Sequence, residues 1–173
     1  ERIIAISSEA RYTAFSFSPV CNFYYKKLTE IKNVGIILDR LKITHDTKVV
    51  CPIRSTQKFT NYVKCMKKAK IFIGISSNSS QVTGGIVGLT EKPVIGVPCA
   101  NERGDDYMLT TVSMPPGVPV ATVGINNGKN AAVLAGEILA IDNPDITELL
   151  EKLKKHFDDK TYAPLVEICK TDY

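Results

Sequence analysis

Three polar loops hold the side chains best suited to chemistry, and each loop directly follows a short apolar run. The loops carry hydroxyl, amide and guanidinium groups, which donate hydrogen bonds to phosphate and ribose oxygens. Such loops bind anions most readily where a helix begins, because the first backbone N–H groups of a helix have no partner within it. The candidate binding residues are Ser7, Ser8, Arg11, Arg54, Ser76, Ser77, Asn78, Ser79 and Gln81.

Each loop also has a purely structural interpretation. Arg11 either binds a phosphate together with Ser8 or is a surface residue of a polar loop. In the second loop, Ser55 or Thr56 would cap the next helix, and the hydroxyls of residues 76–80 would do the same for the helix after them. The residue types alone leave both interpretations open.

Groups that transfer protons or bind metals are scarce. Of the two histidines, His45 is close enough in sequence to the second loop to reach it, whereas His156 lies on a charged segment where solvation is expected. The five cysteines are spread along the chain without C-x-x-C spacing, so neither a disulfide framework nor a zinc site is indicated. Cys51 is either a nucleophile at a strand end or a buried small residue.

Length and composition narrow the class of protein. A chain of 173 residues with 44% hydrophobic and 23% charged residues fits one globular domain. The net charge of +4 is a mild bias, and lysine clusters at 64–70 and 152–155 lie on expected amphipathic helices, so no nucleic-acid partner is expected. No apolar run approaches the roughly 20 residues that cross a bilayer. A cytoplasmic location, without a membrane partner, fits best.

Short apolar runs alternate with helical patterns along the chain. Continuous β-branched runs are typical of strands covered on both faces of a parallel sheet. Strands are expected at residues 3–6, 49–51, 71–75, 93–97 and 118–123. Helices are expected at residues 56–69, 81–89, 130–141 and 144–157. Strands that alternate with helices favour an α/β domain with a doubly wound parallel sheet.

Two regions fit this pattern less well. Within residues 14–47, the apolar run 33–38 predicts an additional strand and residues 44–46 predict a polar turn, while Pro19 argues against one uninterrupted helix. Residues 145–173 are expected to form a C-terminal helical extension. This extension packs either on its own domain or on a neighbouring subunit.

Residues 114–139 read MPPGVPVATVGINNGKNAAVLAGEIL, and residues 92–98 read KPVIGVP. Their residue types suit a rigid turn, buried strands and a helix of small residues. Both segments are very similar to the AIR carboxylase, or N5-carboxyaminoimidazole ribonucleotide mutase, family. The resemblance covers residues 48–158 well and residues 3–12 weakly. The whole chain, 1–173, is therefore interpreted as a single domain of this type, with 14–47 divergent or inserted.

The resemblance implies a fold, a reaction and an assembly. The implied fold is a three-layer αβα sandwich of the flavodoxin-like type, with its site at the carboxyl ends of the parallel strands. The implied reaction, in purine biosynthesis, moves a carboxylate on an aminoimidazole ribonucleotide, or the site binds a related phosphorylated ligand. It needs a phosphate cradle, a proton shuttle and a dry pocket for carbon dioxide. The family implies no cofactor or metal, and it implies a homo-oligomer, an octamer.

The chain departs from the family's pattern at positions that carry chemistry. In the first loop Ser8 matches, whereas Ala10 and Arg11 stand where the family has a serine and an aspartate. In the second loop Arg54 matches, but Ile53 stands where the family has the histidine expected to act as acid and base.

In the third loop, Gln81 stands where a second histidine is usual. Three hypotheses follow. The chain is an active carboxylase or mutase with unusual residues. Alternatively, it is an inactive homologue that serves as a nucleotide-binding or structural subunit of an oligomer or of a longer tandem chain, in which case Ile53 should be buried. The third hypothesis is an unrelated flavodoxin-like domain for another phosphorylated ligand.

Overall fold

The computed structural model describes residues 2–7, 20–76, 80–100 and 111–170, with side-chain surroundings within 29–76, 80–100 and 111–159. The described strands form one sheet in the order β2-β1-β3-β4-β5, and every neighbouring pair is parallel. They are β1 (Arg2–Ser7), β2 (Thr44–Val49), β3 (Ala69–Ser76), β4 (Val94–Pro98) and β5 (Ala121–Thr122).

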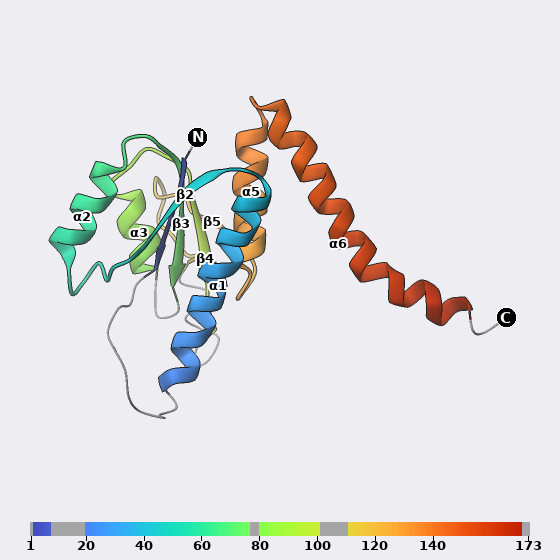
Figure 1. Ribbon diagram of the computed structural model, residues 1–173. Coiled ribbons are helices and arrows are strands. Elements are labelled where there is room, and N and C mark those ends of the chain that lie inside the picture. Colours follow the sequence, from blue (N-terminus) through green and yellow to red (C-terminus); the bar gives the residue numbers. More distant parts are fainter. Residues whose placement is uncertain (1, 8–19, 77–79, 101–110, 171–173) are drawn as a thin grey trace.

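Helices cover both faces of the sheet (Figure 1). On one face lie α2 (Thr56–Cys65) and α3 (Gln81–Val87), and on the other lie α1 (Val20–Arg40) and α5 (Gly128–Ala140). The last described element is α6 (Pro144–Lys170). This arrangement confirms the expected three-layer αβα sandwich, and the strand order is that of flavodoxin-like folds.

The sheet separates two hydrophobic clusters, because successive side chains of a strand point to opposite faces. On β3, Ile71, Ile73 and Ile75 belong to the larger cluster, with α1, α5 and the start of α6. Phe72 belongs to the smaller cluster with α2 and α3. All four side chains are at most 1% exposed. Burial on both faces explains why the sequence of this strand is a continuous apolar run.

The strand predicted at residues 33–38 is wrong, because these residues form the last part of α1. Val34, Ile37, Leu38 and Leu41 are buried and spaced for one helical face. A short β-branched run does not distinguish a strand from a buried helix segment. The helix as described runs from Val20, and Pro19 lies outside the described residues.

The polar turn predicted at residues 44–46 is also wrong, since these residues begin β2. Of the strand predicted at 49–51, only Val49 belongs to β2. The strand lies at the edge of the sheet and pairs with β1 alone, from Arg2 opposite Thr44 to Ser7 opposite Val49. An edge strand need not be apolar on both faces, which explains its polar sequence.

Other boundaries shift for local reasons. The helix predicted at 56–69 ends at Cys65, and Ala69 already begins β3. The strand predicted at 118–123 shortens to Ala121–Thr122. Pro119 has no N–H to donate to a ladder, and the N–H of Val118 is used in a turn to the carbonyl of Pro115.

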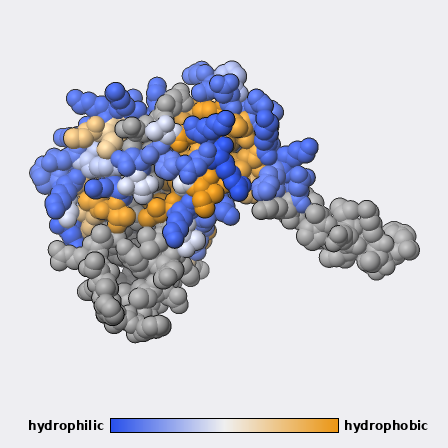
Figure 2. Space-filling model, in the orientation of Figure 1, coloured by the Kyte–Doolittle hydropathy of each residue, from blue (hydrophilic) through white to orange (hydrophobic). Residues whose placement is uncertain are grey.

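The predicted C-terminal helix extends beyond residue 157 to Lys170. Its first turns pack on the domain, where Ile146, Leu150 and Leu153 join the larger cluster. Farther along, the helix projects away from the sheet (Figure 1). In the described part of the chain, no helix is long and apolar enough to cross a membrane. Figure 2 shows apolar surface among charged side chains in the region of α1 and α5.

A buried carboxylate joins α1 to α5. Glu30 is 6% exposed, and its carboxylate accepts a hydrogen bond of 2.6 Å from the N–H of Gly128, the first residue of α5. A negative charge is favourable at a helix N-terminus. A Cβ at Gly128 would lie 2.6 Å from the carbonyl oxygen of Glu30, so only glycine allows this approach.

Two glycines opposite each other let α3 lie close to the sheet. Gly74 on β3 pairs with Gly96 on β4. A Cβ on Gly74 would lie 2.6 Å from the methyl of Thr83 on α3, and one on Gly96 would lie 3.3 Å from the same methyl. The Cβ on Gly96 would also lie 2.6 Å from the methyl of Thr111. This close contact holds α3 against β3 and β4.

We expect Gly74→Ala to lower the free energy of unfolding by about 1–3 kcal/mol, because the added methyl overlaps the buried Thr83. Gly88→Ala is the matched control: its Cβ would meet nothing closer than 3.6 Å, and its stability should change by less than about 1 kcal/mol. Urea unfolding of both variants measures the difference. Equal stabilities would contradict the close packing of α3.

Candidate functional site at the carboxyl edge of the sheet

The parallel strands all end at one edge of the sheet. At this edge lie Ser7, the last residue of β1, and Ser76, the last residue of β3. β1 and β3 are neighbours, and Ser7 is the register partner of Ile75. The turn that carries Arg54 follows β2, and Gln81 begins α3. The fold therefore brings one or more residues of each predicted loop to a common edge.

Other predicted binding residues cannot be placed. Ser8, Arg11, Ser77, Asn78 and Ser79 lie outside the described residues. Among the described ones, Ser76 is 7% exposed, whereas the side chains of Arg54 and Gln81 are exposed. The side chains of Arg54 and Gln81 are therefore accessible to a ligand, whereas Ser76 is buried.

The turn after β2 is held by short-range hydrogen bonds. The N–H of Arg54 donates to the sulfur of Cys51 at 3.4 Å, and the N–H of Ser55 donates to the carbonyl of Cys51 at 3.0 Å. The hydroxyl of Thr56 donates to the carbonyl of Pro52 at 2.8 Å, with that of Ile53 at 3.2 Å. These bonds fix the backbone of the turn while the side chains of Ile53 and Arg54 face solvent.

The structure does not support helix capping as the role of the hydroxyls of Ser55, Thr56 and Ser80. Ser55 occupies the N-cap position of α2 without a side-chain cap bond, and Thr56 bonds backwards to carbonyl groups. Ser80, at the N-cap of α3, also makes no side-chain cap bond. Capping therefore does not account for the serines at these two positions.

The ends of β3, β4 and β5 are joined by backbone hydrogen bonds. The N–H of Cys99 donates to the carbonyl of Ser76 at 2.8 Å, and the N–H of Asn126 donates to that of Pro98 at 2.9 Å. The side-chain oxygen of Asn126 also accepts from the N–H of Ala100 at 3.0 Å. The sequence analysis did not select Asn126, although an asparagine pair before a glycine after a strand is a signal for a turn.

Closeness in sequence does not bring His45 to this edge. It is the second residue of β2 and lies four residues before the strand ends, which is roughly 13 Å away along the strand. Its ring Nδ1 lies 3.3 Å from the carbonyl of Ile43 and 3.8 Å from the carboxylate of Asp39. His156 is exposed on α6, as expected.

Cys51, which was expected at the end of a strand, is half-buried. Its sulfur accepts the hydrogen bond from the N–H of Arg54. Cys51 is therefore not the fully buried small residue that one of the two interpretations expected. Across the described residues, no group of three or more histidine, cysteine or acidic side chains is placed to hold a metal ion.

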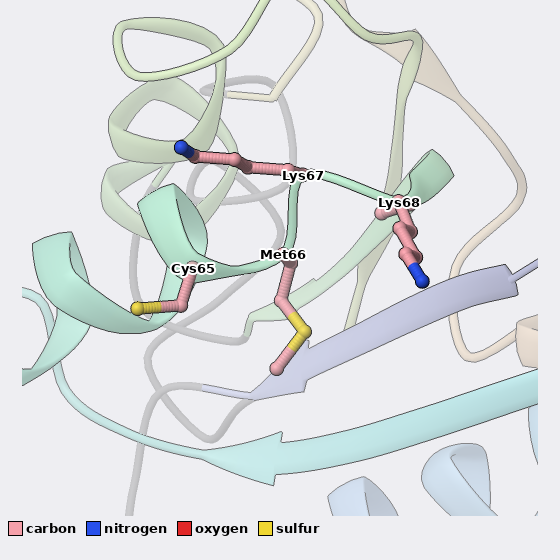
Figure 3. Close-up of a pocket in the computed structure, with 5 residues that line it drawn as sticks. Cys65, Met66, Lys67 and Lys68 are labelled. Carbon is pink, nitrogen blue, oxygen red and sulfur yellow. The ribbon is translucent and has the colours of Figure 1, made fainter.

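A cavity of about 290 Å³ lies at the opposite, amino-terminal edge of the sheet. It is lined by Cys65, Met66, Lys67, Lys68 and Ala69, between the end of α2 and the start of β3. Figure 3 shows that the side chains of Lys67 and Lys68 extend in different directions and do not converge on one point. The cavity is therefore separate from the candidate site and does not have the convergent charges of an anion site.

The family model described as AIR carboxylase matches residues 26–160. The chain belongs to the AIR carboxylase family. The expected family is thereby confirmed, and the hypothesis of an unrelated flavodoxin-like domain is wrong. The match includes most of α1 and all of β2, in the region where the sequence pattern was hardest to interpret.

Relatives and solved structures agree with this assignment. The probable N5-carboxyaminoimidazole ribonucleotide mutase of Methanobrevibacter smithii is 73% identical over 123 residues, which are 71% of this chain and 36% of that protein. The N5-carboxyaminoimidazole ribonucleotide mutase of Methanocaldococcus jannaschii is 40% identical over 128 residues, 73% of this chain and 81% of that protein. The crystal structure of Treponema denticola PurE has a TM-score of 0.76 at 15% identity, over 99% of both chains, and supports the fold.

The chain spans only part of some members of the AIR carboxylase family. The matched part is 36% of the Methanobrevibacter smithii protein and 39% of the probable mutase of Methanothermobacter thermautotrophicus, which is 43% identical over 131 residues. Those two proteins therefore contain sequence that lies outside the match.

We expect Thr56→Val to lower the free energy of unfolding by about 1 kcal/mol, because the valine keeps the shape but loses the hydroxyl that donates to Pro52. Thr56→Ser retains the hydroxyl and is the control. Chemical denaturation compares the two variants. A Thr56→Val variant as stable as Thr56→Ser would show that the hydroxyl does not hold the turn.

Proposed function

We propose that the chain carries an N5-carboxyaminoimidazole ribonucleotide mutase-like or phosphoribosylaminoimidazole carboxylase-like function in purine biosynthesis, and that it binds an aminoimidazole ribonucleotide at the carboxyl edge of the sheet. The observation that carries the proposal is the match of the AIR carboxylase model to residues 26–160. The mutase and carboxylase names of the relatives support it. The reaction class is a carboxylate transfer on the aminoimidazole ring.

Arg54 is the proposed phosphate ligand. It matches the arginine of the family's second loop, and its side chain is exposed on a turn with a fixed backbone. Within the described residues, no carboxylate forms an ion pair with it. Its guanidinium therefore retains donors for a bidentate bond to a phosphate.

The remaining proposed ligands of the phosphate and ribose are the hydroxyl, amide and guanidinium groups of the first and third loops. This assignment extends to those residues outside the described part of the chain. The residues are Ser7, Ser8, Arg11, Ser76, Ser77, Asn78, Ser79 and Gln81.

The proton shuttle is the step for which the described residues at the carboxyl edge offer no histidine. Ile53 stands at the family's histidine position and cannot carry a proton. The hypothesis of an inactive homologue predicted a buried Ile53, but its side chain is 62% exposed. The position therefore remains open to solvent, where a substrate group, a water or a neighbouring subunit can approach it. The family's octameric assembly forms part of this proposal, with the carboxyl edge facing a neighbouring subunit.

Titration of the purified chain with aminoimidazole ribonucleotide, followed by an assay for the 4-carboxy product, tests the proposed function. We expect binding, and we expect Arg54→Gln to weaken it about tenfold or more through loss of a charge-assisted bond. Isothermal titration calorimetry measures the dissociation constants.

Lys70→Gln is the matched control for charge, since Lys70 is an exposed cation near the start of β3, at the opposite edge of the sheet. It should leave the dissociation constant within about twofold, because a distant surface charge is largely screened by salt. Failure of the unaltered chain to bind any aminoimidazole ribonucleotide would overturn the proposed function. Equal effects of the two substitutions would reject Arg54 as a specific ligand.

We expect Ile53→His to raise product formation about a hundredfold, because it places a general acid and base at the family's position. The side chain is largely exposed, so the substitution should change stability by no more than about 0.5 kcal/mol. Ile36→His, at an isoleucine on α1 that is 49% exposed, is the control and should not change the rate. An unchanged rate in Ile53→His, with binding intact, would remove this position from the mechanism.

A further inference from the structure

Asn126 holds the turn after β4 by two hydrogen bonds. Its N–H donates to the carbonyl of Pro98 at 2.9 Å, and its side-chain oxygen accepts from the N–H of Ala100 at 3.0 Å. The residue follows β5, 26 positions beyond Ala100 in the sequence. One residue thus contacts both ends of the turn 98–100 from a different part of the chain.

The backbone conformation at Asn126 makes this double contact possible. Its φ is +51°, in the left-handed region that asparagine enters more readily than most residues other than glycine. Glycine would adopt the same conformation but has no side-chain acceptor. Alanine would lack the acceptor and would also be strained. Asparagine therefore satisfies both requirements, and aspartate retains the acceptor.

The turn held by Asn126 also contacts a candidate binding residue. The N–H of Cys99, in the middle of the turn, donates to the carbonyl of Ser76 at 2.8 Å. Ser76 is the last residue of β3 and is 7% exposed, so its position depends on the neighbouring strand ends. Hydrogen bonds therefore run without a gap from Asn126 through the turn to Ser76.

We propose that Asn126 is a positioning residue for the ribonucleotide site, which fixes the turn 98–100 and through it the end of β3. The proposal rests on the proposed function for the identity of the ligand. Asn126 need not touch the ligand, because it acts through Ala100, Cys99 and Ser76. Loss of its side-chain oxygen frees the N–H of Ala100 and loosens the edge of the site without removing any residue of the core.

The test compares Asn126→Gly with Asn127→Ala. Asn127 is the neighbouring residue of the same type, but its side chain caps α5 by accepting from the N–H of Asn130 at 3.1 Å. We expect Asn126→Gly to speed hydrogen exchange at the Ala100 amide about tenfold and to weaken ribonucleotide binding about tenfold, with little change in melting temperature. Asn127→Ala should lower the melting temperature but leave the binding constant and the exchange of Ala100 unchanged.

Asn126→Asp retains the acceptor and should restore slow exchange at Ala100. The proposal would be overturned if the Ala100 amide exchanged at the same rate in Asn126→Gly as in the unaltered chain. It would also be overturned if exchange were faster but the dissociation constant for aminoimidazole ribonucleotide were unchanged. If the unaltered chain binds no ribonucleotide, the proposed function fails and the positioning role fails with it. In that case, the exchange rate of the Ala100 amide still tests separately whether Asn126 holds the turn.

Discussion

Parallel pairing of β1 with both β2 and β3 is the constraint on which the candidate site depends. In a parallel sheet all strands run in the same direction, so loops far apart in the sequence emerge at the same edge. The register places Ser7 opposite Val49 on one side and Ile75 on the other. Loops after three strands can then contribute to one site. The same direction of the strands sets the cavity of residues 65–69 at the other edge, away from these loops.

The central strands could be predicted from the sequence because both of their faces are buried. Ile71, Ile73 and Ile75 face one cluster and Phe72 faces the other, which gives an uninterrupted apolar run. The edge strand β2 lacks this signal, since one of its sides has no neighbouring strand and its residues are largely polar. In α1, the consecutive residues Ile37 and Leu38 are both buried, which over a few residues gives the same apolar pattern as a buried strand. Only the longer spacing, back to Val34 and on to Leu41, reveals the helix.

The candidate site could be predicted from the sequence only in part. Resemblance to the family located Arg54 and Ile53 on the second loop, and the turn they occupy lies at the expected edge. Exposure of Ile53 could not be deduced, because an isoleucine in a sequence indicates burial by default. Asn126 was missed for another reason. Its partners, Pro98 and Ala100, are distant in sequence, and a hydrogen bond between loops leaves no periodic pattern.

The contact between Glu30 and Gly128 limits how this chain can diverge. The carboxylate has the N-terminus of α5 as its partner, and the glycine leaves no room for any side chain against the backbone of Glu30. Replacing Glu30 alone leaves the buried N–H of Gly128 without this acceptor, and replacing Gly128 alone forces the two helices apart. Glycine is therefore required at position 128 whatever side chain stands at position 30, because the carbonyl oxygen that a Cβ would meet belongs to the backbone.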